Sequence, residues 1–109
     1  MDRLEELLQF LKKFNEDRDW RQFHSENNLA KSIVLEANEL LTEFQFDSNN
    51  YNKKAVEEEL ADVMAYCFDM CLTMGLDPIE IIYQKYQKNA LKYPVERLKA
   101  VVKNITSFK

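Results

Sequence analysis

Two pairs of acidic residues stand inside otherwise apolar segments of this chain. Glu36 and Glu39 lie in SIVLEANELLTEF, and Glu59 and Asp62 lie in EEELADVMAYCF. Side chains three positions apart share a helix face, so each pair can present both carboxylates in one direction. Four carboxylates among apolar neighbours are costly unless something compensates their charge. Divalent cations would do so, and ligands that are all oxygen favour Mg²⁺, with Mn²⁺ as a substitute.

A second interpretation of these acids stays open at this point. Acidic pairs at helical spacing often form a solvated face, as we expect for the neighbouring Glu57 and Glu58, while Glu43 is ambiguous. A di-iron or di-manganese carboxylate bundle is a third reading, but it needs Glu-x-x-His pairs. His24 is the single histidine of the chain and lies outside both acidic pairs, so we discount that site.

The elements that must position these acids are helices. The chain has one glycine and two prolines in 109 residues, and its apolar residues recur every three or four positions. This pattern predicts an all-α fold with four main helices in a four-helix-bundle-like arrangement. Packing the second and third helices antiparallel would bring the two acidic pairs together.

Local signals predict where the four helices begin and end. The first runs from about residue 2 to 15, the second follows the N-cap Ser25 to about Phe46, and the third covers about 53–74 before Gly75. Asp77, Pro78 and Glu80 form a capping box that opens the fourth helix, which Pro94 ends near Tyr93. A further short helix and a frayed tail follow.

Length, charge and cysteine content limit the function classes. We expect a single domain over residues 1–109, located in the cytoplasm because no segment is typical of a leader peptide. The net charge of −4 argues against nonspecific binding to nucleic acid or to an anionic membrane.

Cys67 and Cys71 are expected to be reduced thiols in the core. The second helix is apolar on nearly all sides, which predicts that the chain associates with further copies of itself.

The acidic motifs resemble those of a known family. EANE and ELAD, separated by 19 residues, are similar to the signature of the MazG-like nucleoside triphosphate pyrophosphohydrolases, and closest to the deoxycytidine triphosphate pyrophosphatase-like subgroup. DWRQFH, FQF and KYQKNALKYP resemble further segments of that subgroup, so that the likeness covers about residues 18–95 and leaves a tail at about 96–109. The resemblance implies cleavage of a nucleoside triphosphate between its α and β phosphates, with Mg²⁺ bound by Glu36, Glu39, Glu59 and Asp62.

The same resemblance assigns substrate contacts. Lys85 and Asn89 match residues that contact the triphosphate, and Lys92, in the KYP element, is a further candidate. For the base, Trp20, His24 and Phe46 could supply stacking faces and a hydrogen-bonding ring, and they match positions of the nucleotide pocket, as does Tyr66. Phe46 departs from the subgroup, which tends to have tryptophan there.

Two functions therefore compete. The first is a Mg²⁺-dependent pyrophosphohydrolase that cleans the nucleotide pool, converting (deoxy)nucleoside triphosphates to monophosphate and pyrophosphate. The alternative is a non-catalytic helical module that oligomerises or senses nucleotide. The alternative predicts that the four acids can be replaced without loss of function.

Overall fold

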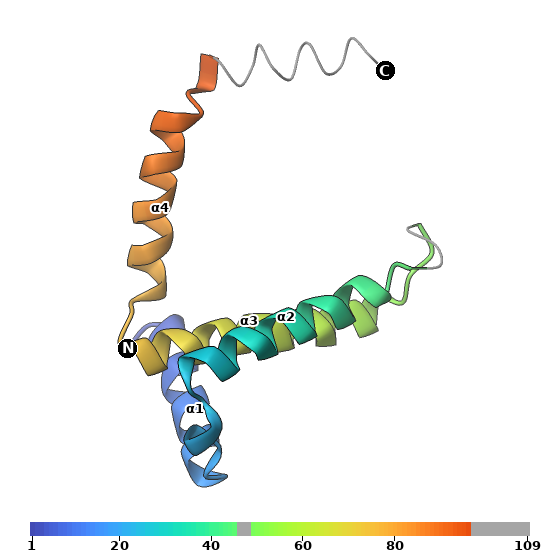
Figure 1. The fold of residues 1–109 in the computed structure, drawn as a ribbon, viewed down its shortest axis with the longest axis vertical. Coiled ribbons are helices and arrows are strands. Elements are labelled where there is room, and N and C mark those ends of the chain that lie inside the picture. The colour runs from blue at the N-terminus through green and yellow to red at the C-terminus, as the bar shows by residue number, and fades with distance from the viewer. Residues whose placement is uncertain (46–48, 97–109) are drawn as a thin grey trace. The chain divides into compact units, whose positions relative to one another are not determined.

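The computed structural model describes residues 1–45 and 49–96, and its regular elements in these ranges are all helical. In chain order they are α1 (Arg3–Asp17), the 3₁₀ helix η1 (Trp20–Phe23), α2 (Glu26–Thr42), α3 (Lys53–Met74) and α4 (Pro78–Lys92) (Figure 1). The predicted all-α class is confirmed. No helix in the described part of the chain is both long and apolar enough to cross a membrane.

The chain divides into two compact units. Met1–Leu76 contains α1, η1, α2 and α3, and the unit that begins at Asp77 contains α4. The expectations of one domain and of a single four-helix bundle therefore stay predictions. The short helix expected beyond Pro94 lies mostly outside the described residues.

Side-chain caps explain where the helices begin. Ser25 Oγ accepts a hydrogen bond from the Asn28 N–H at 3.2 Å, and Asp77 Oδ1 accepts from the Ile79 N–H at 2.9 Å, as their positions predicted. Pro78 occupies the first turn of α4. Gly75 ends α3 with φ +68°, the left-handed conformation that glycine adopts without a steric penalty.

Two local predictions are wrong. α2 ends at Thr42 rather than near Phe46, because the N–H groups that follow bond to carbonyls three residues back instead of four. The Thr42 hydroxyl also donates to the Glu39 carbonyl, which competes with continued helix. The second wrong prediction is the capping box of α4: the Glu80 carboxylate accepts from Gln84 at 3.1 Å rather than from the Asp77 N–H. Asp77 still caps the helix, by accepting from two N–H groups.

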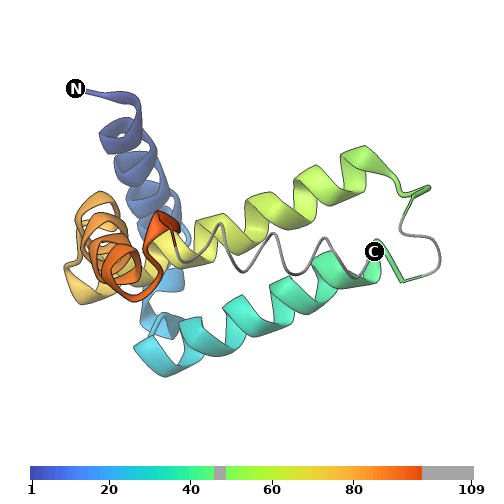
Figure 2. The same cartoon turned by 90° about the horizontal axis from the view of Figure 1, so that it is seen from above.

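α2 and α3 form an antiparallel hairpin, and the two helices lie side by side in both views (Figures 1 and 2). At the end of the hairpin the rings of Phe44 and Tyr51 meet with centroids 4.8 Å apart. This contact joins the segment that follows α2 to the segment that precedes α3, on either side of residues 46–48, which are outside the description. The pairing fixes which residues of α2 face which residues of α3.

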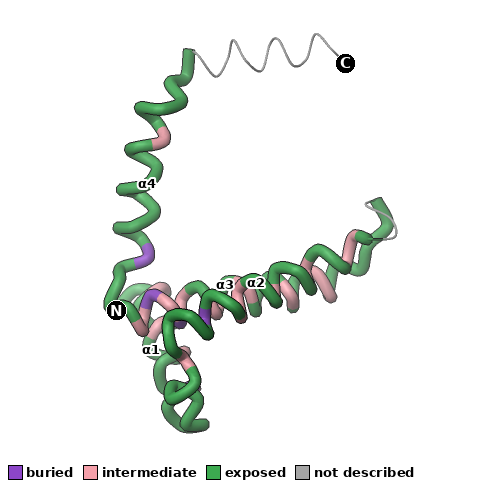
Figure 3. The backbone as a smooth tube through the Cα atoms, in the orientation of Figure 1, coloured by how far each residue is buried: buried purple, intermediate pink, exposed green. Residues whose placement is uncertain are grey.

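The core of the first unit sits where α1 packs against α3 near the start of α2 (Figure 3). Leu29 is only 1% exposed, and Asn15, Asp69 and Cys71 are also buried. Both cysteines are reduced thiols, as predicted, but Cys67 is exposed, so its expected place in the core is wrong. Two of the most buried groups are thus polar, an amide and a carboxylate.

Candidate metal centre and base pocket

Three carboxylates gather between α2 and α3. Glu36 from α2, and Glu59 and Asp62 from α3, each offer one oxygen, and these three oxygens lie within 4.8 Å of one another. The antiparallel hairpin causes this, because it sets the middle of α2 against the first half of α3. The structure therefore brings together one member of the first acidic pair and both members of the second.

The electrostatics of this cluster match a site built for a cation. Burial raises the pKa of Glu36, and the neighbouring carboxyl group of Glu39 and the charge of Asp62 raise it further. Burial and Glu39 likewise raise the pKa of Glu59. One oxygen of Glu36 and one of Glu59 (Oε2 in both) are shielded from solvent, and among the described residues neither finds a hydrogen-bond donor. Oxygens left in this state fit a hard divalent cation, which would satisfy both.

Glu39 lies beside the cluster without belonging to the group of three. Its carboxyl group is a leading cause of the raised pKa of both Glu36 and Glu59, so it sits within reach of both helices' acids. Glu43, one turn further along α2, also contributes to the raised pKa of Glu59. The four predicted acids therefore form one neighbourhood, with Glu39 at its edge.

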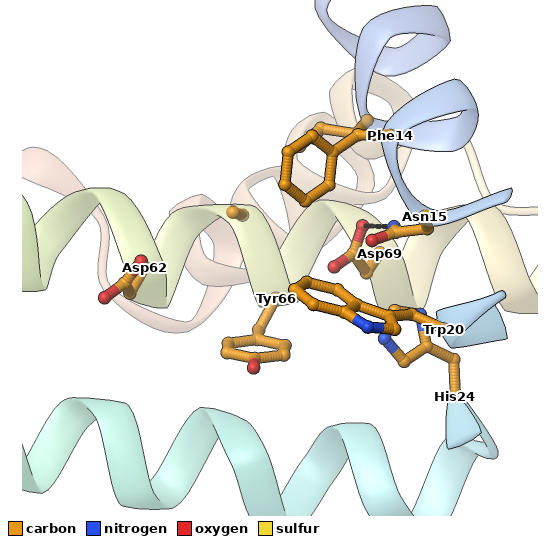
Figure 4. A pocket seen from close by; sticks show the side chains of 9 residues that line it. Phe14, Asn15, Trp20, His24, Asp62, Tyr66 and Asp69 are labelled. Carbon is orange, nitrogen blue, oxygen red and sulfur yellow. Dashed lines mark hydrogen bonds between the residues drawn. The ribbon is translucent and has the colours of Figure 1, made fainter. Parts of the chain in front are cut away.

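A cavity of about 150 Å³ adjoins the acid cluster in the first unit (Figure 4). Its walls come from α1, η1, the turn that follows and α3. The lining residues are Leu11, Phe14, Asn15, Trp20, His24, Asp62, Ala65, Tyr66 and Asp69. Asp62 belongs to both the cavity and the cluster, so the two features form one continuous site.

A tight turn after α1 positions the ring of Trp20. Asp19 adopts φ 55°, a left-handed conformation that aspartate tolerates better than most residues. Gln22 supports the turn by donating to the Asp19 carbonyl oxygen at 2.9 Å and to its carboxylate at 3.0 Å. The Trp20 ring then meets Phe14 edge to face, with centroids 5.6 Å apart. Trp20 is 46% exposed, so part of its surface remains available to a ligand.

Tyr66 lies between the cavity and the acids. Burial raises the pKa of its hydroxyl, and the negative charges of Glu36 and Asp62 raise it further. The ring also lines the cavity, below Asp62 and beside Trp20 in Figure 4. Trp20, His24 and Tyr66, three of the residues expected to hold the base, thus line one space.

The sequence analysis missed two residues of this site, Asn15 and Asp69. Each is 6% exposed, and the Asn15 amide donates to Asp69 Oδ1 at 2.9 Å. A signal existed, because Asp69 is a lone acid inside the apolar run AYCFDMCL and follows Asp62 by seven residues, which places both on one face of α3. Nothing in the sequence pairs Asn15 with it.

The remaining predicted substrate contacts are not placed against this site. Lys85, Asn89 and Lys92 all belong to α4, in the second unit, which is described by itself. Lys85 and Lys92 are exposed and Asn89 is half-buried. Phe46 lies outside the described residues.

Comparison with known proteins adds independent information. A family model described as "MazG-like family" matches residues 31–108. A crystal structure of a pyrophosphatase from Archaeoglobus fulgidus superposes with a TM-score of 0.77 at 36% identity, over 86% of this chain and 94% of that chain.

The curated relatives include mammalian proteins named dCTP pyrophosphatase 1. The mouse protein is 31% identical over 101 residues, which is 84% of this chain and 59% of the relative. The human protein is 29% identical over 100 residues, with the same 84% of this chain and 59% of its own length. This chain therefore spans less than two thirds of these relatives.

Proposed function

We propose, from the premise that this chain belongs to the MazG-like family, that it is a divalent-cation-dependent pyrophosphohydrolase of deoxynucleoside triphosphates. The reaction would release a nucleoside monophosphate and pyrophosphate, and its role would be to clean the nucleotide pool. The names of the mouse and human relatives, and the pyrophosphatase from Archaeoglobus fulgidus, support this proposal.

One observation carries the proposal. An acid cluster with two unsatisfied, shielded oxygens shares Asp62 with an aromatic cavity. A cation-binding end and an aromatic end joined in one site suit a molecule that has a polyphosphate at one end and a ring at the other. A deoxynucleoside triphosphate has that structure.

The acids would have two roles at the phosphate end of the site, cation binding and orientation of the attacking water. Glu36, Glu59 and Asp62 would hold the cation, with Mg²⁺ as the expected ion and Mn²⁺ as a substitute. When bound, this cation would neutralise phosphate charge and make water a better nucleophile. Glu39 lies beside the group of three, where its carboxyl group raises the pKa of both Glu36 and Glu59, and it would orient the attacking water and accept its proton.

The other predicted residues would contact the substrate away from the reacting bond. The triphosphate would be bound by Lys85, Asn89 and Lys92. This role rests on the match of these residues to the family pattern. Trp20, His24 and Tyr66 would enclose the base, a role supported by their common cavity. Phe46 would complete the base contacts.

We also propose that a second copy of the chain covers the outer face of α2. Val34, Leu35 and Leu41 are 67%, 64% and 66% exposed, although they belong to the most apolar part of that helix. A homodimer or homotetramer would bury them. The two reduced cysteines fit the reducing cytoplasm, where we expect the protein to act. Sedimentation at micromolar concentration tests the assembly, and a stable monomer would contradict it.

The activity is tested by incubating the protein with a panel of nucleotides, with Mg²⁺ or with EDTA. Glu59→Gln is the informative variant, because it keeps the shape of the side chain and removes a charge from the cluster. Glu58→Gln is its matched control, since Glu58 is the exposed neighbour on the same helix. We expect the wild type and Glu58→Gln to form monophosphate and pyrophosphate only with Mg²⁺. Glu59→Gln should lose at least about a hundredfold in kcat/KM, as enzymes do when one charge-stabilising group is removed.

Two results would contradict the proposal. The first is a wild-type protein that forms no monophosphate and pyrophosphate from any nucleotide. If that protein still bound a nucleotide, the alternative function of a nucleotide-sensing module would be favoured. The second is a Glu59→Gln variant with the same Mg²⁺-dependent rate as Glu58→Gln, which would remove the acid cluster from the mechanism.

A further inference from the structure

One segment of the chain supplies every lining residue of the cavity that does not belong to α3. This segment, the cap, comprises residues 3–24, which form α1, η1 and the turn after η1. Figure 4 shows Asn15 and Trp20 at one end of the cavity and Asp62 at the other. The three acids that gather between α2 and α3 lie outside the cap. The aromatic end of the site therefore depends on where the cap packs on α3, whereas the cation end does not. The cap contributes Leu11, Phe14, Asn15, Trp20 and His24.

The cap packs on α3 with little buried apolar surface. Within α1, every residue of which the structure describes, only Asn15 is buried. Leu7 and Phe10 are 41% and 62% exposed. An isolated helix of about 15 residues is only marginally stable in water. The packing of α1 on α3 therefore depends strongly on its polar contact.

That contact is the hydrogen bond between Asn15 and Asp69. The Asn15 amide donates to Asp69 Oδ1 at 2.9 Å, and each residue is 6% exposed. Burial raises the pKa of Asp69, while the hydrogen bond from Asn15 and the charges of His24 and Arg21 lower it. Groups from α1, from η1 and from the turn after η1 thus act on one carboxylate of α3. A hydrogen bond to a charged group is stronger than a neutral one, and loss of the donor leaves the buried carboxylate under-satisfied.

Short-range contacts connect Asn15 to the ring of Trp20. Phe14 precedes Asn15, and its ring meets Trp20 edge to face with centroids 5.6 Å apart. The Arg18 guanidinium lies 3.6 Å from the centroid of the Phe14 ring. Asp19 closes the turn, because its N–H donates to the carbonyl three residues back at 3.0 Å. The position of Asn15 on α3 therefore determines the position of Trp20 in the cavity.

We propose that Asn15 and Asp69 are positioning residues, whose hydrogen bond fixes the cap on α3 so that Trp20 and His24 enclose the ring of the bound nucleotide. Substrate affinity should fall in proportion to the fraction of molecules whose cap is docked. The acid cluster lies outside the cap, so the rate of the chemical step should not change. The inference rests on the proposed nucleotide hydrolysis and adds to that site two residues that act through the cap.

The first experiment uses the wild type alone. Hydrogen exchange of the α1 amides reports how often the cap opens. Exchange is recorded in Mg²⁺, without ligand and with a nonhydrolysable dCTP analogue at about ten times its dissociation constant. If only the docked cap binds the analogue, exchange of these amides should slow by about elevenfold. Exchange that does not change in α1 would overturn the inference.

The second experiment compares KM and kcat for dCTP in three variants. Asn15→Asp puts two carboxylates at the contact. Gln9→Glu is its matched control, because it makes the same change from amide to acid at an exposed position of α1. The double variant Asn15→Asp/Asp69→Asn exchanges the positions of the amide and the carboxylate, which restores the hydrogen bond between the two helices.

We expect Asn15→Asp to raise KM by at least about tenfold, as loss of a hydrogen bond to a charged group does, with kcat within about twofold of the wild type. The double variant should recover a KM within about threefold of the wild type. Gln9→Glu should match the wild type in both constants. A role in stability alone would lower the Tm of Asn15→Asp and leave its KM unchanged.

The inference is overturned by a folded Asn15→Asp protein with the KM of Gln9→Glu, or by a folded double variant that keeps the raised KM. A loss in kcat without a change in KM would also overturn it. If Asn15→Asp does not fold, the exchange experiment and the double variant decide. Failure of the proposed hydrolysis has a different signature, because no variant and no wild type would then release pyrophosphate, while exchange would still report whether the analogue stabilises the cap.

Discussion

Replacing Glu36 with glutamine should have opposite effects on stability in the absence and in the presence of divalent cations. The substitution keeps the shape of the side chain and removes one charge from three oxygens that lie within 4.8 Å of one another. Without a cation, that charge only repels its neighbours, because the shielded Oε2 finds no donor among the described residues. With a cation, the same charge binds it.

The magnitude follows from Coulomb's law. The three oxygens lie within 4.8 Å of one another, and two unit charges at that separation repel by about 0.9 kcal/mol even at the dielectric constant of water. For a chain of 109 residues, this free energy corresponds to about 4 °C in Tm. A cation present at ten times its dissociation constant stabilises the folded wild type by about 1.4 kcal/mol, or about 6 °C.

The assay is thermal unfolding of the wild type, Glu36→Gln and the control Glu58→Gln, each in EDTA and in Mg²⁺. In EDTA, Glu36→Gln should melt about 4 °C above the wild type. In Mg²⁺ the wild type should gain about 6 °C and Glu36→Gln much less, so that the order reverses. Glu58→Gln should follow the wild type in both buffers.

A Glu36→Gln protein that melted below the wild type in EDTA would show that the cluster is not repulsive. A rise in the Tm of Glu36→Gln in Mg²⁺ as large as that of the wild type would contradict the second half of the prediction. Glu36 would then contribute nothing to cation binding.

Three further predictions concern the fold and the buried carboxylate. Leu29→Ala should lower the free energy of unfolding in urea by about 3 kcal/mol, because Leu29 is 1% exposed, and a loss below about 1 kcal/mol would mean that this packing is dispensable. Gly75→Ala should cost about 1 kcal/mol for backbone strain alone, since φ is +68° and a Cβ would meet nothing within 4 Å; an unchanged urea midpoint would contradict this. For Asp69, whose folded pKa lies above the ordinary 3.8, stability is fully present below the unfolded pKa and is lost as pH rises through the folded pKa. The unfolding free energy of Asp69→Asn should therefore improve relative to the wild type between pH 4 and 7, and a constant difference would count against a raised pKa.

Helix boundaries set by local chemistry could be predicted from the sequence. Ser25, Gly75 and Asp77 act through hydrogen bonds or backbone angles within four residues, so tertiary structure changes them little. The end of α2 was missed because it depends on a gradual change from four-residue to three-residue hydrogen bonds, which has no residue signature. The turn at Asp19 was missed for the same reason, since a left-handed aspartate is rare and its sequence is ordinary.

The acid cluster could be anticipated because its spacing and its neighbours are both periodic. Glu36, Glu59 and Asp62 occur at helical intervals beside apolar stripes, and an antiparallel hairpin is the simplest way to pack them. The position of Glu39 at the edge depends on the rotation of α2, which the sequence does not fix.

The pair of Asn15 and Asp69 could not be anticipated as a pair. The two residues are 54 positions apart and meet only because α1 packs against this part of α3. The helix face of Asp69 was visible in the sequence, whereas its partner on α1 depended on tertiary packing.

The most direct test of the central claim is a crystal structure of the protein with Mn²⁺ and a nonhydrolysable deoxycytidine triphosphate analogue, with the ion located by its anomalous scattering. We expect an anomalous peak coordinated by oxygens of Glu36, Glu59 and Asp62 and by the phosphates, with the base between Trp20 and Tyr66. If the three carboxylates bind no ion while the analogue is bound elsewhere, the proposed site is wrong.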